Sequence, residues 1–85
     1  MRSRIEFSGH AATALAERMI DPAWVARVLE NPEFSRADTR HPERILAFGR
    51  IGEHGGRWLR VVYERNGETY RVVTTFFDRN AEKPA

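Results

Sequence analysis

The chain has 85 residues with a formal net charge of +2, and 41% of them are hydrophobic and 31% charged, which fits one globular domain and excludes collagen-like repeats and wholesale disorder. It contains no cysteine, which excludes disulfide bonds, a thiolate nucleophile and a cysteine-bearing zinc site. No apolar run approaches the roughly 20 residues of a membrane span, so we expect a cytoplasmic protein without a signal peptide or a membrane partner.

The first third of the chain predicts a strand and two helices. Residues 4 to 7 alternate polar and apolar side chains, which is typical of a short strand. Ser8 is a suitable N-cap for an alanine-rich helix over residues 9 to 19. The pair Asp21-Pro22 predicts the start of a second helix, which should end near Asn31-Pro32 because a residue before proline disfavours helical angles.

From residue 33 onward the apolar period becomes alternating. Strands are predicted over residues 43 to 51, 57 to 65 and 69 to 77, and residues 34 to 39 are a further short, exposed strand. The fold class is therefore α+β: two N-terminal helices packed on one face of an antiparallel sheet of three to four strands, plus a short N-terminal strand. Residues 1 to 78 form the domain, and residues 79 to 85 form a flexible tail.

Asn66-Gly67 is the strongest hairpin signal in the sequence. A two-residue turn there pairs Tyr63 with Tyr70 and predicts which side chains face the helices. The predicted core side of this hairpin is apolar and consists of Leu59, Val61, Tyr63, Tyr70, Val72 and Phe76.

The opposite side of the same hairpin predicts a site for an anion. In this register Arg60 and Arg71 lie on a diagonal of neighbouring strands, within reach of one phosphate. Trp58 and Phe77 would stack on a base, and Thr75 would donate to a phosphate oxygen.

The two arginines are equally well explained as solvated positions on the wet side of a sheet. Four large apolar side chains share that side, however, namely Trp58, Val62, Val73 and Phe77. A fully solvent-exposed face of a sheet rarely carries four large apolar side chains. We therefore expect a partner protein, a nucleic acid or the C-terminal tail to cover part of this face.

The chain contains thirteen arginines and one lysine, Lys83. Guanidinium groups bind phosphate through two parallel hydrogen bonds and stack on bases, which favours a nucleic-acid partner, although codon preference explains the same bias.

The histidines do not have the spacing of metal ligands, so we expect no metal site. His10 and Arg18 can share one side of the first helix, where a histidine could act as general acid or base while the arginine stabilises charge on a phosphorane-like transition state. His10 is equally well explained as a capping or packing residue. His54 lies in a glycine-rich turn and is expected to be a mobile loop tip.

Five short segments carry a family resemblance: Phe7-Ser8-Gly9-His10-Ala11, Glu17-Arg18-Met19-Ile20, Val28-Leu29-Glu30-Asn31-Pro32, Leu59-Arg60-Val61-Val62-Tyr63 and Tyr70-Arg71-Val72-Val73-Thr74. Together they resemble the bacterial domain of unknown function 4258 (DUF4258) family over residues 5 to 78, and the later half also resembles BrnT-type toxins. The resemblance implies a RelE-like, toxin-type fold and metal-independent RNA cleavage.

The resemblance also assigns residues. His10 and Arg18 match the family's helix histidine and arginine, and Arg60 matches the arginine of the penultimate strand, whereas Arg71 follows from the register alone. The sequence departs from the pattern at Met19, where a glycine is usual, and it lacks the lysine that BrnT-type toxins carry near the first helix.

These observations lead to a hypothesis about function. We expect a toxin-like endoribonuclease that cleaves single-stranded RNA by attack of the 2′-hydroxyl group, without a cofactor. Its catalytic residues would be His10, Arg18, Arg60 and Arg71, and its RNA-binding residues Trp58, Thr75 and Phe77. The alternatives are a non-catalytic protein-interaction module and weak nucleic-acid binding without chemistry. RNA, an antitoxin protein and a second copy of the chain are the candidate partners.

Overall fold

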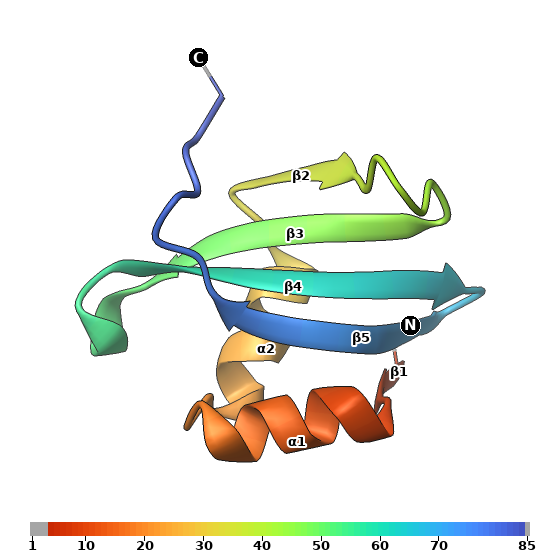
Figure 1. Ribbon diagram of the computed structural model, residues 1–85, viewed down its shortest axis with the longest axis horizontal. Helices are drawn as coiled ribbons and strands as arrows, with labels where there is room; N and C mark the ends of the chain where they lie inside the picture. Colours follow the sequence, from red (N-terminus) through yellow and green to blue (C-terminus); the bar gives the residue numbers. More distant parts are fainter. Residues whose placement is uncertain (1–3, 85) are drawn as a thin grey trace.

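The computed structural model describes residues 4–84, which form a five-stranded sheet with two α-helices on one side (Figure 1). The elements in chain order are β1 (Arg4–Phe7), α1 (Gly9–Glu17), α2 (Pro22–Glu30), β2 (Phe34–Ala37), β3 (Arg44–Ile51), the 3-10 helix η1 (Gly52–His54), β4 (Arg57–Asn66) and β5 (Thr69–Phe77). The strand order across the sheet is β1-β5-β4-β3-β2.

The α+β class is confirmed, with two differences from the expected arrangement. The sheet is mixed rather than antiparallel, because β1 pairs in parallel with the first half of β5 while the other neighbours are antiparallel. Helical structure is also not confined to the N-terminal part, since η1 lies between β3 and β4. The connection from β1 to β5 runs through both α-helices and strands β2 to β4, and it is long enough for β5 to lie parallel to β1.

The predicted caps position both helices. The Ser8 side chain accepts a hydrogen bond from the backbone N–H of Ala11, and Asp21 accepts one from Ala23 with proline at the next position. The first helix ends in a Schellman motif, in which the N–H of Ile20 donates to the carbonyl of Leu15 and Met19 takes a left-handed φ of 54°. The helix therefore ends two residues earlier than predicted, and Met19 occupies a position that favours glycine.

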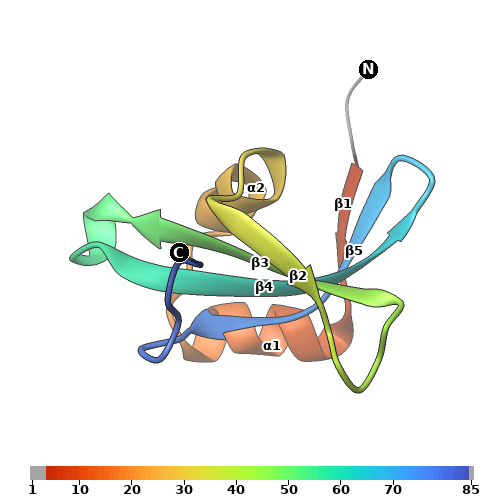
Figure 2. The ribbon, with the colours of Figure 1, turned by 90° about the horizontal axis from the view of Figure 1, so that it is seen from above.

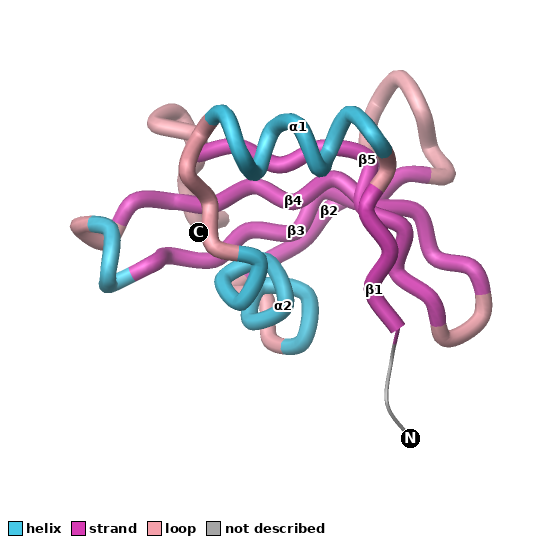
Figure 3. Tube along the Cα trace, turned by 90° about the horizontal axis from the view of Figure 1, so that it is seen from below, coloured by secondary structure: helices cyan, strands magenta, loops and turns pink. Residues whose placement is uncertain are grey.

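The main core lies between the helices and the sheet. Its buried helix residues are Ala11, Ile20, Val25, Val28 and Leu29, and its buried sheet residues are Ala47, Ile51, Leu59, Val61, Tyr70 and Val72. Gly49 brings α2 close to the sheet, because a Cβ atom there would lie 3.0 Å from Val28 Cγ2. The views in Figures 2 and 3 show both helices on this side of the sheet, opposite the side that remains open.

The predicted register of the β4–β5 hairpin is wrong. Gly67, with a φ of 60°, is the first of two central turn residues and Glu68 is the second, so Asn66 pairs with Thr69 and Tyr63 with Val72. This shift of two residues keeps the same side chains on each face, and Tyr63 and Tyr70 do pack together, with ring centroids 5.1 Å apart.

A β-bulge then changes the faces along the rest of β5. The pairing is irregular at Val62 and Tyr63 of β4, whose partners are Thr74 and Val72, so that Val73 is the extra residue. Beyond it Thr75 and Phe77 point toward the helices and Phe76 points away, which reverses the prediction for these three residues. Alternation along a strand could not reveal this change, because a bulge adds one residue to one strand only.

We call the side of the sheet away from α1 and α2 the open face. It carries a small second cluster in which Leu46, Phe48 and Val62 are buried, with Phe34, Trp58, Val73 and Ala81 packed against them. The chain after β5 crosses this face: the N–H of Asp78 donates to the carbonyl of Trp58, and Ala81 contacts the cluster. The C-terminal segment is thus one of the covers that the sequence suggested. None of the helices in residues 4–84 is long and apolar enough to cross a membrane.

Candidate anion-binding site

One row of side chains runs across the open face from β2 to β5. Phe34 pairs with Phe48, Phe48 with Arg60, and Arg60 with Phe76, so these four residues project from neighbouring strands at the same level. The rings of Phe34 and Phe48 are stacked with centroids 4.5 Å apart. Arg36, two residues along β2, points to the same side as Phe34 because side chains alternate along a strand.

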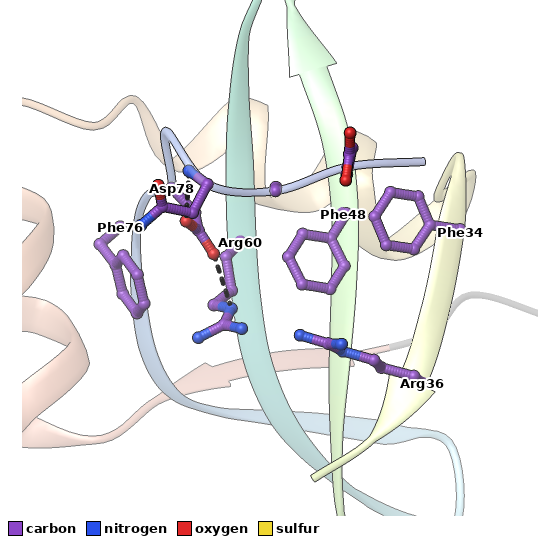
Figure 4. Close-up of a pocket in the computed structure, with 9 residues that line it drawn as sticks. Phe34, Arg36, Phe48, Arg60, Phe76 and Asp78 are labelled. Atoms are coloured by element: carbon purple, nitrogen blue, oxygen red, sulfur yellow. Dashed lines mark hydrogen bonds and ion pairs between the residues drawn. The ribbon is translucent and has the colours of Figure 1, made fainter. Parts of the chain in front are cut away.

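Two guanidinium groups flank the buried Phe48 ring. The guanidinium carbons of Arg36 and Arg60 lie 5.5 Å and 5.2 Å from its centroid, so they are at most about 11 Å apart. Figure 4 shows both groups pointing into the same space, Arg36 from β2 and Arg60 from β4. The aromatic ring stabilises both cations by about 0.5–2 kcal/mol each, depending on solvent exposure.

Apart from the ion pair between Arg60 and Asp78, the donors of these two groups have no acceptor in the described chain. Neither guanidinium donates a hydrogen bond to another residue between 4 and 84, although each carries five N–H donors. The Nε atom of Arg60 is buried without a hydrogen-bond partner. Groups that are held in place but have free donors are suited to bind an anion.

Asp78 supplies the carboxylate nearest to Arg60. Its Oδ2 atom lies 3.4 Å from Arg60 Nε, and the two side chains are only 14% and 22% exposed. The other Asp78 oxygen accepts the N–H of Asn80, which holds the carboxylate at the start of the C-terminal segment. Asp78 is therefore an internal counterion for Arg60, set at the rim of the space between the arginines (Figure 4).

The space itself is an open depression of about 640 Å³. Its walls are Phe34, Arg36, Phe48, Arg60, Phe76, Asp78, Asn80, Ala81 and Glu82. A second depression of about 470 Å³ adjoins it, shares Arg36, Arg60 and Phe76, and adds Arg40 and Arg44. There the N–H of Arg40 donates to Asp38 and lowers the pKa of that carboxyl group. We call the first of these spaces the arginine depression.

The predicted diagonal of Arg60 and Arg71 does not exist. In the observed register Arg71 lies opposite Glu64 on β4 and Glu6 on β1, while Arg60 lies opposite Phe76. Four residues along β4 separate the two positions, about 13 Å at roughly 3.3 Å per residue. The two arginines therefore do not converge on one phosphate, and Arg36 takes the place that Arg71 was expected to fill.

The three predicted RNA contacts are divided between the two faces. Trp58 is on the open face and half-buried, beneath the guanidinium of Arg50 at 5.1 Å. Thr75 is fully buried on the helix side, where its hydroxyl donates to the carbonyl of Arg60. Phe77 also faces the helices, with its ring centroid 4.4 Å from that of His54.

The helix residues His10 and Arg18 are likewise apart from each other. His10 is exposed at the start of α1, and Arg18 is the C-cap residue at the other end, about 12 Å along the axis at 1.5 Å per residue. Arg18 donates to the carbonyl of Thr75 and lies 5.9 Å from the Phe76 ring. It therefore reaches the edge of β5, close to the arginine depression, whereas His10 does not.

The sequence reasoning missed Arg36, Phe48 and Asp78 as site residues. A signal for Arg36 was present, since Phe34 and Arg36 alternate in a short strand, but nothing local indicated which strand it would join. His54 was expected to be a mobile tip, yet its ring packs between Trp24 and Phe77, with centroids 5.8 Å and 4.4 Å away.

The described residues hold no cluster of three or more histidine, aspartate or glutamate side chains that could bind a metal ion. The donors in the arginine depression are cationic, and cationic groups bind phosphate or carboxylate rather than a metal.

Comparison with known proteins gives the family of the chain. Searches of curated proteins and of solved structures returned no match. The family model described as "Domain of unknown function (DUF4258)" matches residues 7–77, which include both α-helices and all strands from β2 to β5. The chain belongs to the DUF4258 family.

Proposed function

We propose that this chain binds single-stranded RNA on the open face of its sheet and acts as a toxin-like endoribonuclease without a metal ion. A backbone phosphate would lie in the arginine depression, between the guanidinium groups of Arg36 and Arg60. Phosphate contacts of this kind position a nucleic acid without reading its sequence.

The observation that carries the proposal is the pair of arginines around Phe48. Both guanidinium groups are held against one ring, both point into one open space, and neither donates a hydrogen bond within the described chain. Two planar cations with free donors match a phosphate group, which accepts several hydrogen bonds at once. An arginine that is only solvated at the surface would not need to share a ring and an open space with a second arginine.

The order of the elements supports the toxin-like part of the proposal. Two helices on one side of the sheet and an antiparallel run from β2 to β5 are features that the RelE-like arrangement implied by the sequence resemblance would also have. The open face then corresponds to the side where basic residues of such toxins act.

The proposed cleavage forms a bond from the 2′-oxygen to phosphorus and breaks the bond to the 5′-oxygen. The products are a 2′,3′-cyclic phosphate and a 5′-hydroxyl group, which takes up a proton. Negative charge builds on the non-bridging oxygens, where Arg36 and Arg60 would stabilise it. Glu82 lines the depression and forms no ion pair with a described residue, so it is our candidate for the base that removes the 2′-hydroxyl proton.

Binding is tested with a labelled single-stranded RNA of about 12 nucleotides, within the range that small single-strand-binding folds cover. Arg36→Gln is the cleanest variant, because the Arg36 side chain is exposed and makes no ion pair or hydrogen bond with residues 4–84. We expect affinity to fall about tenfold and the slope of log K against log salt to decrease by about 0.7, the value for one lost phosphate contact on a single strand.

Arg4→Gln is the matched control, since it removes the same charge from exposed β1 at the far edge of the sheet. Equal losses for Arg4→Gln and Arg36→Gln would mean that net charge alone governs binding, and the proposed site would be wrong.

Cleavage is tested on the same RNA in excess EDTA, with DNA of the same sequence as the control. The DNA should bind but stay intact, because it lacks the 2′-hydroxyl group. Arg60→Gln and Glu82→Gln should abolish the cyclic phosphate product while Arg4→Gln retains it. Intact RNA with the unaltered protein, with and without ribosomes, would reject the enzyme and leave RNA binding alone.

The alternative function, a protein-interaction module, has less support from the surface. Among the described large apolar side chains Met19 is the one that is mostly exposed, at 83%, whereas Leu46, Phe48 and Val62 on the open face are buried. This alternative would be favoured if Trp58→Ala abolished self-association or capture of a protein partner while Arg36→Gln changed neither.

A further inference from the structure

We propose a second phosphate subsite at the end of the sheet, between Arg18 and Arg57, where the RNA strand leaves the open face. This inference rests on the proposed function, because it extends the same path by one phosphate. The subsite is an open depression of about 360 Å³ lined by Arg18, Arg57, Phe76 and Phe77.

Three segments that are distant in sequence meet at this place. Arg18 ends α1, Phe76 and Phe77 end β5, and Arg57 begins β4 just after η1. In Figures 1 and 2 the end of α1, the tip of β5 and the turn between β3 and β4 lie at the same end of the sheet. The fold thus brings two cations to one depression, one from the end of α1 and one from the start of β4.

Both cations are held in place by groups that leave most of their donors free. One Arg18 nitrogen donates to the carbonyl of Thr75 at 3.2 Å, and one Arg57 nitrogen lies 3.3 Å from Nε2 of His54. That histidine is itself packed against Trp24 and Phe77. Neither arginine forms an ion pair with a carboxylate of residues 4–84, in contrast to Arg27, Arg44, Arg50 and Arg60.

The two subsites are joined by a single aromatic ring. The guanidinium carbons of Arg60 and Arg18 lie 5.3 Å and 5.9 Å from the Phe76 centroid, so they are at most about 11 Å apart. Arg57 lies 5.3 Å from the neighbouring Phe77 ring and lines the same depression as Arg18. A row of alternating arginines and phenylalanines therefore runs from β2 to the edge of β5 and consists of Arg36, Phe48, Arg60, Phe76 and Arg18. Its cations suit successive phosphates of one extended strand.

The edge of β5 leaves this route open. Strand β1 pairs only with Thr69 to Val72, so the last residues of β5 have a strand on the β4 side and none on the other side. The carbonyls of Val73 and Thr75 on that edge are taken by the side chains of Ser8 and Arg18. No further backbone pairing is needed there, and a single nucleic-acid strand can cross the edge.

The experiment compares two probes, a uridine dinucleotide with one phosphodiester and the RNA of about 12 nucleotides. Arg18→Gln and Arg57→Gln should each weaken binding of the long RNA about fivefold and lower its salt slope by about 0.7, while dinucleotide binding stays unchanged. Arg4→Gln should leave both probes unaffected. Thermal unfolding of each variant checks that the fold is retained.

The outcomes separate this inference from the proposed function. If Arg36→Gln weakens the long RNA but Arg18→Gln and Arg57→Gln do not, the second subsite is wrong and the arginine depression stands. If Arg36→Gln has no effect on either probe, the proposed function itself fails. Equal weakening of both probes by Arg18→Gln and Arg57→Gln would show that they act on the first subsite or on the fold, and would also overturn the inference.

Discussion

Replacing Asp78 with asparagine should change stability and RNA affinity in opposite directions. Asparagine has nearly the same shape and still accepts the N–H of Asn80, so the variant removes the charge and little else. The charge lies 3.4 Å from Arg60 Nε, so it neutralises part of the guanidinium charge that a phosphate in the arginine depression would meet.

The size of the stability change follows from partial burial. At 3.4 Å and an effective dielectric constant of about 20, the gross attraction is about 5 kcal/mol, and much of it is offset by lost hydration. Exposed ion pairs contribute about 0.2–1 kcal/mol and loss of one partner from a buried pair costs about 3–5 kcal/mol. Side chains that are 14% and 22% exposed fall between these cases, so we expect a loss of about 2 kcal/mol.

In a domain of this size that loss lowers the melting temperature by about 8–16 °C. RNA affinity should rise about tenfold, which corresponds to ~1.4 kcal/mol, because the carboxylate no longer neutralises the Arg60 charge and no longer repels the phosphate. Differential scanning fluorimetry and fluorescence anisotropy measure the two quantities on one preparation.

Asp21→Asn is the control, since it removes one negative charge from the helix side and asparagine caps a helix as well as aspartate does. It should leave the RNA affinity within about twofold. A parallel fall in stability and affinity for Asp78→Asn, or an unchanged affinity, would refute the idea that Asp78 and RNA share Arg60.

Three further predictions concern the fold. Met19→Gly should stabilise the protein by about 1 kcal/mol in urea unfolding, since Met19 has a φ of 54° and its side chain is 83% exposed. Gly49→Ala should destabilise by about 1–3 kcal/mol because its Cβ would lie 3.0 Å from Val28, and the cost should shrink in a Val28→Ala background. The third concerns pH: Arg27 lowers the pKa of Glu53 to about 2, so the stability that this pair adds is present above about pH 4.5 and is lost as the pH falls toward 2. The stability difference between the unaltered protein and Glu53→Gln, followed by thermal unfolding, should shrink over the same interval.

Each of these has its own contrary result. Equal stability of Met19→Gly and Met19→Ala would mean that the left-handed backbone is not strained. Additive effects of Gly49→Ala and Val28→Ala would show that the close approach does not matter. A Glu53→Gln difference that is constant from pH 7 to pH 2 would exclude the Arg27 pair as its cause.

The helices and strands were predictable because their signals are local. Ser8 and Asp21-Pro22 mark helix starts, and Asn66-Gly67 marks the hairpin although its turn residues are Gly67 and Glu68. Capping and turn angles depend on few neighbours. The predicted bounds of β5 agree with the structure. The predicted faces of the β5 side chains are wrong beyond Val73, because the bulge depends on how two strands pair and not on either strand alone.

The same distinction explains the candidate site. Arg60 was found because its face follows from alternation within β4. Arg36 and Asp78 reach it from β2 and from the chain after β5, and only the tertiary fold brings these segments together. Arg71 was chosen because the predicted register placed it near Arg60. The observed register is shifted by two residues and places Arg71 between Glu64 and Glu6.

Ser8 links the two layers of this molecule through one hydroxyl group. The hydroxyl oxygen accepts a hydrogen bond from the N–H of Ala11 at the start of α1. The same hydroxyl group donates a hydrogen bond to the carbonyl of Val73, the residue at which β5 changes its pairing. Aspartate at this position would start the helix equally well but has no proton to give. The residues that a ligand meets on the far side of the sheet are therefore selected in part by a side chain that it never touches.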